Sequence, residues 1–116
     1  MKLKNDVNLA DVVFKVGLTP VNDVSFERTI QAIYSGDLLS MVMGKADEES
    51  LWITVQTHVN SIAVAEMMDF SGIVFVEGLM PDEDALKKAN ELSLPLFTTT
   101  DDACQLIQKI VLLGIE

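Results

Sequence analysis

Residues 51–76 read LWITVQTHVNSIAVAEMMDFSGIVFV, and this stretch decides the fold class. Two short and almost wholly apolar runs, 51–55 and 72–76, enclose a polar loop and a segment of helical length. Apolar runs of that length are typical of strands buried on both faces of a sheet. The order strand, helix, strand predicts a parallel pair, because parallel neighbours need a long crossover and a helix supplies it.

The same alternation extends on both sides of this stretch. From residue 29 onward, strand and helix alternate four times, with the other strands expected at 29–34 and 96–98 and the other helices over 38–43, 82–92 and 100–111. Strands that alternate with helices predict an α/β layer fold. We therefore expect an α/β/α arrangement with a mainly parallel central sheet of four to five strands.

The first 28 residues give a weaker pattern. The run VVFKV, residues 12–16, favours a strand, expected at the sheet edge with its orientation left open, and residues 2–9 are compatible with a short helix. Asp37 and Asn60 are side chains of the kind that caps helices, and we expect them to cap the helices that follow them. With 116 residues, the chain predicts one domain covering 1–116.

Charge excludes several classes of partner. The chain has 18 acidic and 8 basic residues and a net charge of -10. Arg28 is the only arginine, and no basic residue lies between Lys45 and Lys87. Phosphate recognition needs clustered basic side chains, so neither nucleic acid nor an anionic membrane surface is expected as a partner.

Motifs exclude further classes of function. The single Cys104 cannot form an internal disulfide or a cysteine-rich zinc site. Neither a P-loop nor a GxGxxG motif is present, so we expect no cofactor and no nucleotide chemistry. The start MKLKND lacks the apolar core of a signal peptide, and no run of about 20 apolar residues occurs despite a mean hydropathy of +0.32. A cytoplasmic protein is expected.

The candidate site follows from the expected sheet. Ligands favour the crevice beyond the carboxyl ends of parallel strands. The chain places a set of polar side chains there, which we take as candidates for binding a ligand or a partner: Asp37, Gln56, Thr57, His58, Asn60 and Glu77. Capping and local packing explain part of this set equally well. His58 could pair with Asp37 or Glu77, but their spacing matches no metal-site signature, so no metal is expected.

Four methionines leave two interpretations open. Met41, Met43, Met67 and Met68 lie on two neighbouring expected helices. A core position is the simpler interpretation, and an adaptable contact surface is the alternative. The second interpretation, together with the 49% apolar content of so short a chain, favours a homodimer.

Two stretches resemble a known family. SGDLLSMVMG (35–44) and the run from LWITVQTHVN to LSLPLFTT (51–99) resemble DRTGG domains, which are similar to the N-terminal domain of HPr kinase/phosphorylase, and the resemblance covers about residues 28–113. Where the family has Asp-Arg-x-Thr-Gly-Gly, this chain has ERTIQA at 27–32, so both glycines are missing. The resemblance implies a single DRTGG-like domain without the kinase's catalytic part. Its small stand-alone members further imply a link to anaerobic redox and hydrogenase systems.

Two hypotheses of function follow. The first is a non-catalytic regulatory or scaffolding module that dimerises and binds a partner protein or a small effector. The alternative is a small enzyme that uses His58 with Asp37 or Glu77 at the strand ends. The missing catalytic motifs and the family resemblance favour the first.

Overall fold

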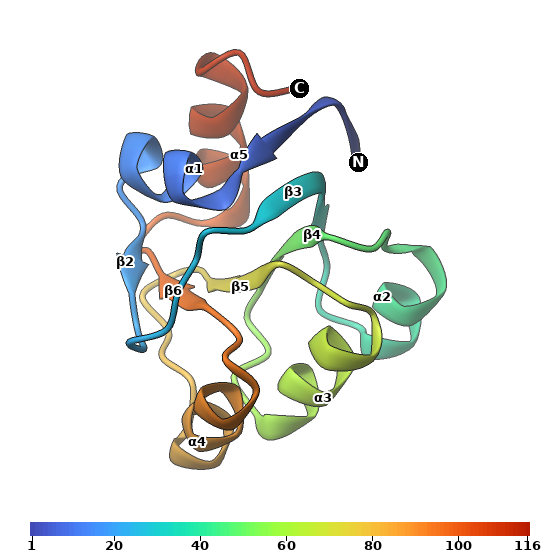
Figure 1. The fold of residues 1–116 in the computed structure, drawn as a ribbon, viewed down its shortest axis with the longest axis vertical. Helices are drawn as coiled ribbons and strands as arrows, with labels where there is room; N and C mark the ends of the chain where they lie inside the picture. Colours follow the sequence, from blue (N-terminus) through green and yellow to red (C-terminus); the bar gives the residue numbers. More distant parts are fainter.

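A computed structural model describes residues 1–116 as a six-stranded sheet with five helices (Figure 1). The strands are β1 (Lys2–Asn8), β2 (Thr19–Pro20), β3 (Thr29–Ser35), β4 (Ser50–Thr54), β5 (Gly72–Phe75) and β6 (Leu96–Thr98). The helices are α1 (Leu9–Val16), α2 (Leu39–Lys45), α3 (Val59–Met67), α4 (Glu83–Leu92) and α5 (Ala103–Leu112).

The strand order is β1-β3-β4-β5-β6-β2. The four inner strands are parallel, whereas β1 and β2 pair antiparallel at the two edges. This confirms the α/β fold, the mainly parallel sheet and the position of 51–55 inside it. The sheet has six strands and not four to five, because both edge strands come from the first 28 residues.

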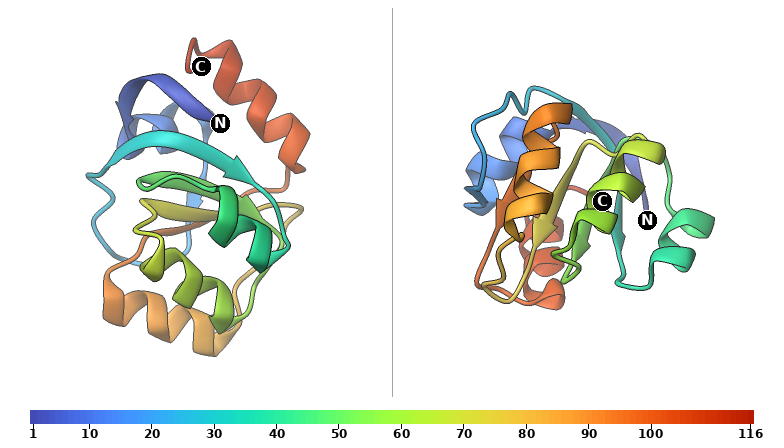
Figure 2. Two further views of the ribbon diagram at one scale, coloured as in Figure 1. Left: turned by 90° about the vertical axis from the view of Figure 1, so that its right-hand side faces the viewer. Right: turned by 90° about the horizontal axis from the view of Figure 1, so that it is seen from below.

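Helices cover both faces of the sheet (Figures 1 and 2). On one face, side chains of α1 and α5 such as Val12 and Leu106 join a core cluster with Ile53 and Val74 of the sheet. On the other face, side chains of α2, α3 and α4 pack around Trp52. Every residue of β4 and β5 is buried, as expected of strands covered on both sides.

The prediction for the first 28 residues was wrong. Residues 2–8 form a strand, and VVFKV belongs to helix α1. The Asn8 side chain accepts a hydrogen bond from the Ala10 N–H and starts the helix, and Gly17 ends it in the left-handed conformation at φ 83°. Leu9, Val12 and Val13 are buried at helical spacing. Consecutive β-branched valines favour a strand by local propensity, so the sequence pattern does not indicate a helix here. The helix forms because burial of these side chains against the sheet outweighs the modest helix penalty of valine.

Helix α4 begins where the sequence predicts, whereas α5 begins at Ala103 and not at residue 100. Asp82 caps α4 by accepting from the Ala85 N–H, and Asp102 caps α5 by accepting from the Gln105 N–H. The Gln105 side chain in turn accepts from the Asp102 N–H, which completes a capping box.

The core interpretation of the methionines was wrong for three of the four. Met41, Met43 and Met67 are exposed, and Met68 is half-buried. Because α2 and α3 are short helices with one side on the sheet, their other side chains are left at the surface.

In the structure, no helix has the length and apolar character needed to cross a membrane.

Candidate functional site

The candidate residues lie at the edge of the sheet where the parallel strands end, hereafter the carboxyl edge. Asp37 follows β3, and Gln56, Thr57 and His58 follow β4. Glu77 follows β5, and Asn60 lies in the first turn of α3. Hydrogen bonds gather some of these residues around Asp37 and others around His58, whereas Glu77 bonds elsewhere and the Asn60 side chain makes no bond within the chain.

Asp37 ties the end of β3 to the end of β4. Its carboxylate accepts from the Thr54 hydroxyl (2.8 Å) and from the Val55 N–H (3.0 Å). The Gln56 side-chain amide donates to the Asp37 carbonyl oxygen (2.7 Å). The predicted helix cap at Asp37 was therefore wrong: Leu38 occupies that position, with no side-chain cap. The carboxylate lies within reach of the neighbouring strand and bonds there instead.

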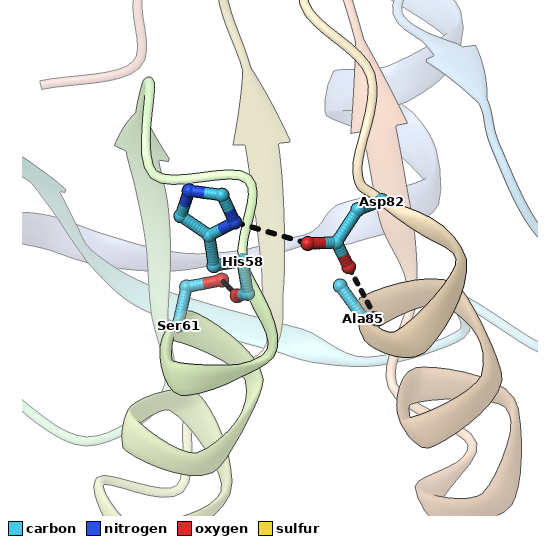
Figure 3. Close-up of polar contacts among 4 residues, drawn as sticks. All are labelled: His58, Ser61, Asp82 and Ala85. Atoms are coloured by element: carbon cyan, nitrogen blue, oxygen red, sulfur yellow. Dashed lines mark hydrogen bonds and ion pairs between the residues drawn. The ribbon is translucent and has the colours of Figure 1, made fainter.

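His58 occupies the capping position that was predicted for Asn60 (Figure 3). Its carbonyl oxygen accepts from the Ser61 hydroxyl (2.7 Å) and from the Ser61 N–H (3.0 Å). A cap at Asn60 would start the helix at Ser61, but α3 begins two residues earlier, at Val59. The Asn60 side chain is exposed in the first turn.

The acid beside His58 is Asp82, and not Asp37 or Glu77. The imidazole Nδ1 lies 3.0 Å from the Asp82 carboxylate (Figure 3). A carboxylate can only accept, so the proton of this bond is on Nδ1, and the neutral ring then leaves Nε2 as an acceptor. The His58 side chain is 75% exposed, so Nε2 is available to solvent or to a ligand.

Asp82 holds the loop after β4 against the start of α4. Its N–H donates to the Thr57 carbonyl oxygen (3.1 Å), while its carboxylate bonds the Ala85 N–H (2.8 Å) and the His58 ring. The Ala85 N–H, followed by the His58 ring, holds the pKa of the Asp82 carboxyl below its ordinary value of 3.8. The sequence predicts only that Asp82 begins a helix. One signal in the sequence could have placed Asp82 at this edge: it starts the helix that follows the strand 72–76, and helices that follow parallel strands begin at the carboxyl edge.

We expect Asp82→Ala to destabilise the protein at neutral pH. A carboxyl whose pKa is lowered by folding stabilises the protein fully at pH values above its pKa in the unfolded chain. This contribution is lost as the pH falls through its pKa in the folded protein. The wild type and the variant should therefore differ in melting temperature above about pH 4 and converge below the lowered pKa of Asp82. Thermal melting followed by circular dichroism across pH 2 to 7 checks this.

The matched control is Asn60→Ala at the start of α3. The Asn60 side chain makes no hydrogen bond within the chain, so its loss should change the free energy of unfolding by less than about 0.5 kcal/mol. A loss of about 1 kcal/mol, the usual cost of removing a cap, would contradict the assignment of the cap to His58.

Glu77 belongs to a separate part of the carboxyl edge. It adopts a left-handed conformation at φ 61°, and its N–H donates to the Asp101 carbonyl oxygen (2.8 Å). The next N–H, of Gly78, donates to the Thr99 carbonyl oxygen (2.8 Å). These bonds tie the loop after β5 to the loop after β6.

The cavities of the protein lie away from the candidate residues. Two small ones, of about 140 and 230 Å³, share Arg28 and Asp69 near the amino ends of the parallel strands. One of about 560 Å³ lies on the outer side of α4, and one of about 440 Å³ lies beside α1. The structure brings together no group of three or more His, Cys, Asp or Glu side chains that could hold a metal ion. The candidate residues at the carboxyl edge therefore line none of these cavities.

Comparisons with known proteins bear on the fold. No family model matches the chain, and no curated protein matches it. Among solved structures, it is similar to the CBS and DRTGG domains of the regulatory region of Clostridium perfringens pyrophosphatase, a structure complexed with the activator diadenosine tetraphosphate. The two share 15% sequence identity and a TM-score of 0.72 over 90% of this chain, which spans 46% of the other. The chain thus has a fold found in that regulatory region, as its resemblance to DRTGG domains predicts.

Proposed function

We propose that this chain is a non-catalytic regulatory or scaffolding module that dimerises and binds a partner protein or a small effector. The observation that carries the proposal is the fold that it shares, over 90% of its length, with a regulatory region of a pyrophosphatase. The resemblance to stand-alone DRTGG proteins adds a partner class, the redox and hydrogenase systems of anaerobes.

The contact between His58 and Asp82 supports the carboxyl edge as the binding surface. His58 Nε2 and the Gln56 side chain are polar groups on one short loop, and the bond from the Asp82 N–H to Thr57 holds that loop in place. A fixed loop loses little conformational entropy when it binds, which favours recognition. We place Gln56, Thr57 and His58 in contact with the partner or effector, with Asp37, Asn60 and Glu77 around them.

A comparison of variants in one capture experiment tests the proposal. Immobilised wild type, His58→Ala and Phe14→Ala are incubated with extract of the native cell, and the retained proteins and small molecules are identified by mass spectrometry. We expect one species to be retained by the wild type and by Phe14→Ala and lost with His58→Ala. Equal retention by the wild type and both variants would overturn the assignment of the surface.

Stability measurements separate binding from folding. The exposed His58 ring makes one exposed contact, so His58→Ala should melt close to the wild type. If it melts as severely as a core deletion, by about 2–5 kcal/mol, His58 is structural and the site assignment fails.

The activator of the related regulatory region provides a further test. Diadenosine tetraphosphate carries several negative charges, and the carboxyl edge has Asp37, Glu77 and Asp82 but no free basic side chain, since Lys109 pairs with Asp101. We therefore expect no shift in melting temperature with millimolar diadenosine tetraphosphate. A saturable shift that is lost in His58→Ala would show that the two regions share a ligand as well as a fold.

The contact between His58 and Asp82 also favours one alternative function, a small enzyme that uses His58 as a general base. A carboxylate on Nδ1 orients a histidine so that Nε2 can accept a proton. The Ser61 hydroxyl, however, donates to the His58 carbonyl oxygen and not to the ring (Figure 3). Hydrolysis of model esters or phosphoesters that is retained through repurification and abolished by His58→Ala would favour this alternative.

A further inference from the structure

Exposed apolar side chains gather on the two adjacent helices α2 and α3. In Figure 2 (right), α3 lies between α4 and α2. Val59, Ala63 and Met67 recur every four residues along α3 and are exposed, so they form one stripe. Leu38, the residue before α2, and Met41 within it are exposed one turn apart. Leu38 and Met67 are 62% and 65% exposed. Contiguous exposed apolar side chains, unlike single ones, are typical of interaction surfaces.

The same two helices carry almost no charge. Within α2 and α3, the charged residues are Lys45 and Glu66, so the net charge of the pair is zero in a chain whose total is -10. Helix α4, on the other side of α3, is instead rich in charge, with Glu83, Asp84 and Lys87 among its residues. Burial of charged side chains costs free energy that burial of Met and Val does not.

We propose that two copies of this chain pair through this surface, hereafter the α2–α3 face, formed by Leu38, Met41, Val59, Ala63 and Met67. The inference rests on the proposed homodimer and names the surface that makes it. Two copies of charge -10 repel each other, and contact is least costly where each contributes no net charge. A two-fold pairing brings the face against itself, and unbranched methionine side chains adapt to such a contact.

Exposed apolar side chains also occur elsewhere, at Phe14 of α1, at Leu79 and Met80 in the loop after β5, and at Val111, Leu112 and Leu113 at the end of α5. The group on α5 lies three to five residues before Glu116, which pairs with Lys4, so a contact there would strip water from charged side chains. Phe14 of α1 is 90% exposed, but Asp11 and Lys15 lie three residues before it and one after it on the same helix. A contact centred on Phe14 would strip water from Asp11, which lies one turn away on the same helix face. Phe14 therefore supplies the matched control for the test.

Sedimentation equilibrium of four proteins tests the inference. Wild type, Met67→Glu, Val59→Glu and Phe14→Glu are compared over a micromolar range, after circular dichroism has verified that each is folded. Wild type and Phe14→Glu should sediment at twice the 12.7 kDa chain mass. Met67→Glu and Val59→Glu should raise the dimer dissociation constant at least about tenfold, because each buries two like charges.

Salt dependence gives a second and independent measurement. Because the α2–α3 face holds no net charge, salt should mainly screen the repulsion between the two acidic copies. The dimer dissociation constant of the wild type should therefore fall between about 0.02 and about 0.5 M NaCl. A dissociation constant that rises with salt would mean that ion pairs hold the dimer, and would overturn the proposed surface.

The outcomes distinguish the surface from the dimer itself. A monomeric wild type would refute the proposed homodimer. A dimeric wild type that Phe14→Glu dissociates, while Met67→Glu and Val59→Glu leave it intact, would refute the α2–α3 face alone.

Discussion

Trp52→Ala is expected to lower the free energy of unfolding by about 3–5 kcal/mol. Trp52 lies in β4, is fully buried, and packs at an edge-to-face angle on Phe70, with ring centroids 5.7 Å apart. Its indole N–H donates to the Gly36 carbonyl oxygen (2.8 Å), so the variant also removes the bond between β4 and the loop after β3. Since small domains have a total stability of about 5–15 kcal/mol, this loss leaves a marginal fold.

Urea denaturation followed by circular dichroism measures this loss, because the variant removes the only tryptophan and with it the fluorescence signal. Trp52→Phe is the matched control. It keeps an aromatic ring in the core but cannot bond to Gly36, so we expect a smaller loss. A loss under about 1 kcal/mol for Trp52→Ala would contradict its position at the centre of the core.

Leu9→Ala is expected to cost about 2–5 kcal/mol, whereas Phe14→Ala should change stability by less than about 0.5 kcal/mol. In the helix α1, Leu9 is fully buried against the sheet and Phe14 points to solvent. If VVFKV were a strand, Phe14 would share a face with Val12 and Val16, and Leu9 would lie in the preceding segment. The two variants therefore discriminate between the helix and the strand.

The same urea titration provides the measurement. A larger loss for Phe14→Ala than for Leu9→Ala would contradict the helix and support the strand. Because Phe14 is 90% exposed, its variant also controls for general effects of shortening an apolar side chain in this segment.

The sequence alone determined the α/β architecture from residue 29 onward. Apolar runs such as 51–55 and 72–76 are too short for buried helices and too apolar for half-exposed strands, so only a sheet covered on both faces accommodates them. The starts of α4 and α5 were also determined locally, because Asp82 and Asp102 each bond an N–H three residues away.

Tertiary structure decided what depends on contacts between distant residues. Local propensity favoured a strand at 12–16, but packing against the sheet makes it a helix. Asp37 is a suitable cap by local chemistry, yet the end of β4, 17 residues away, provides better donors. The partner of His58 lies 24 residues along the chain, and only the juxtaposition of two helix starts places it there. Spacing in the sequence shows which groups reach the carboxyl edge, whereas packing determines which of them touch.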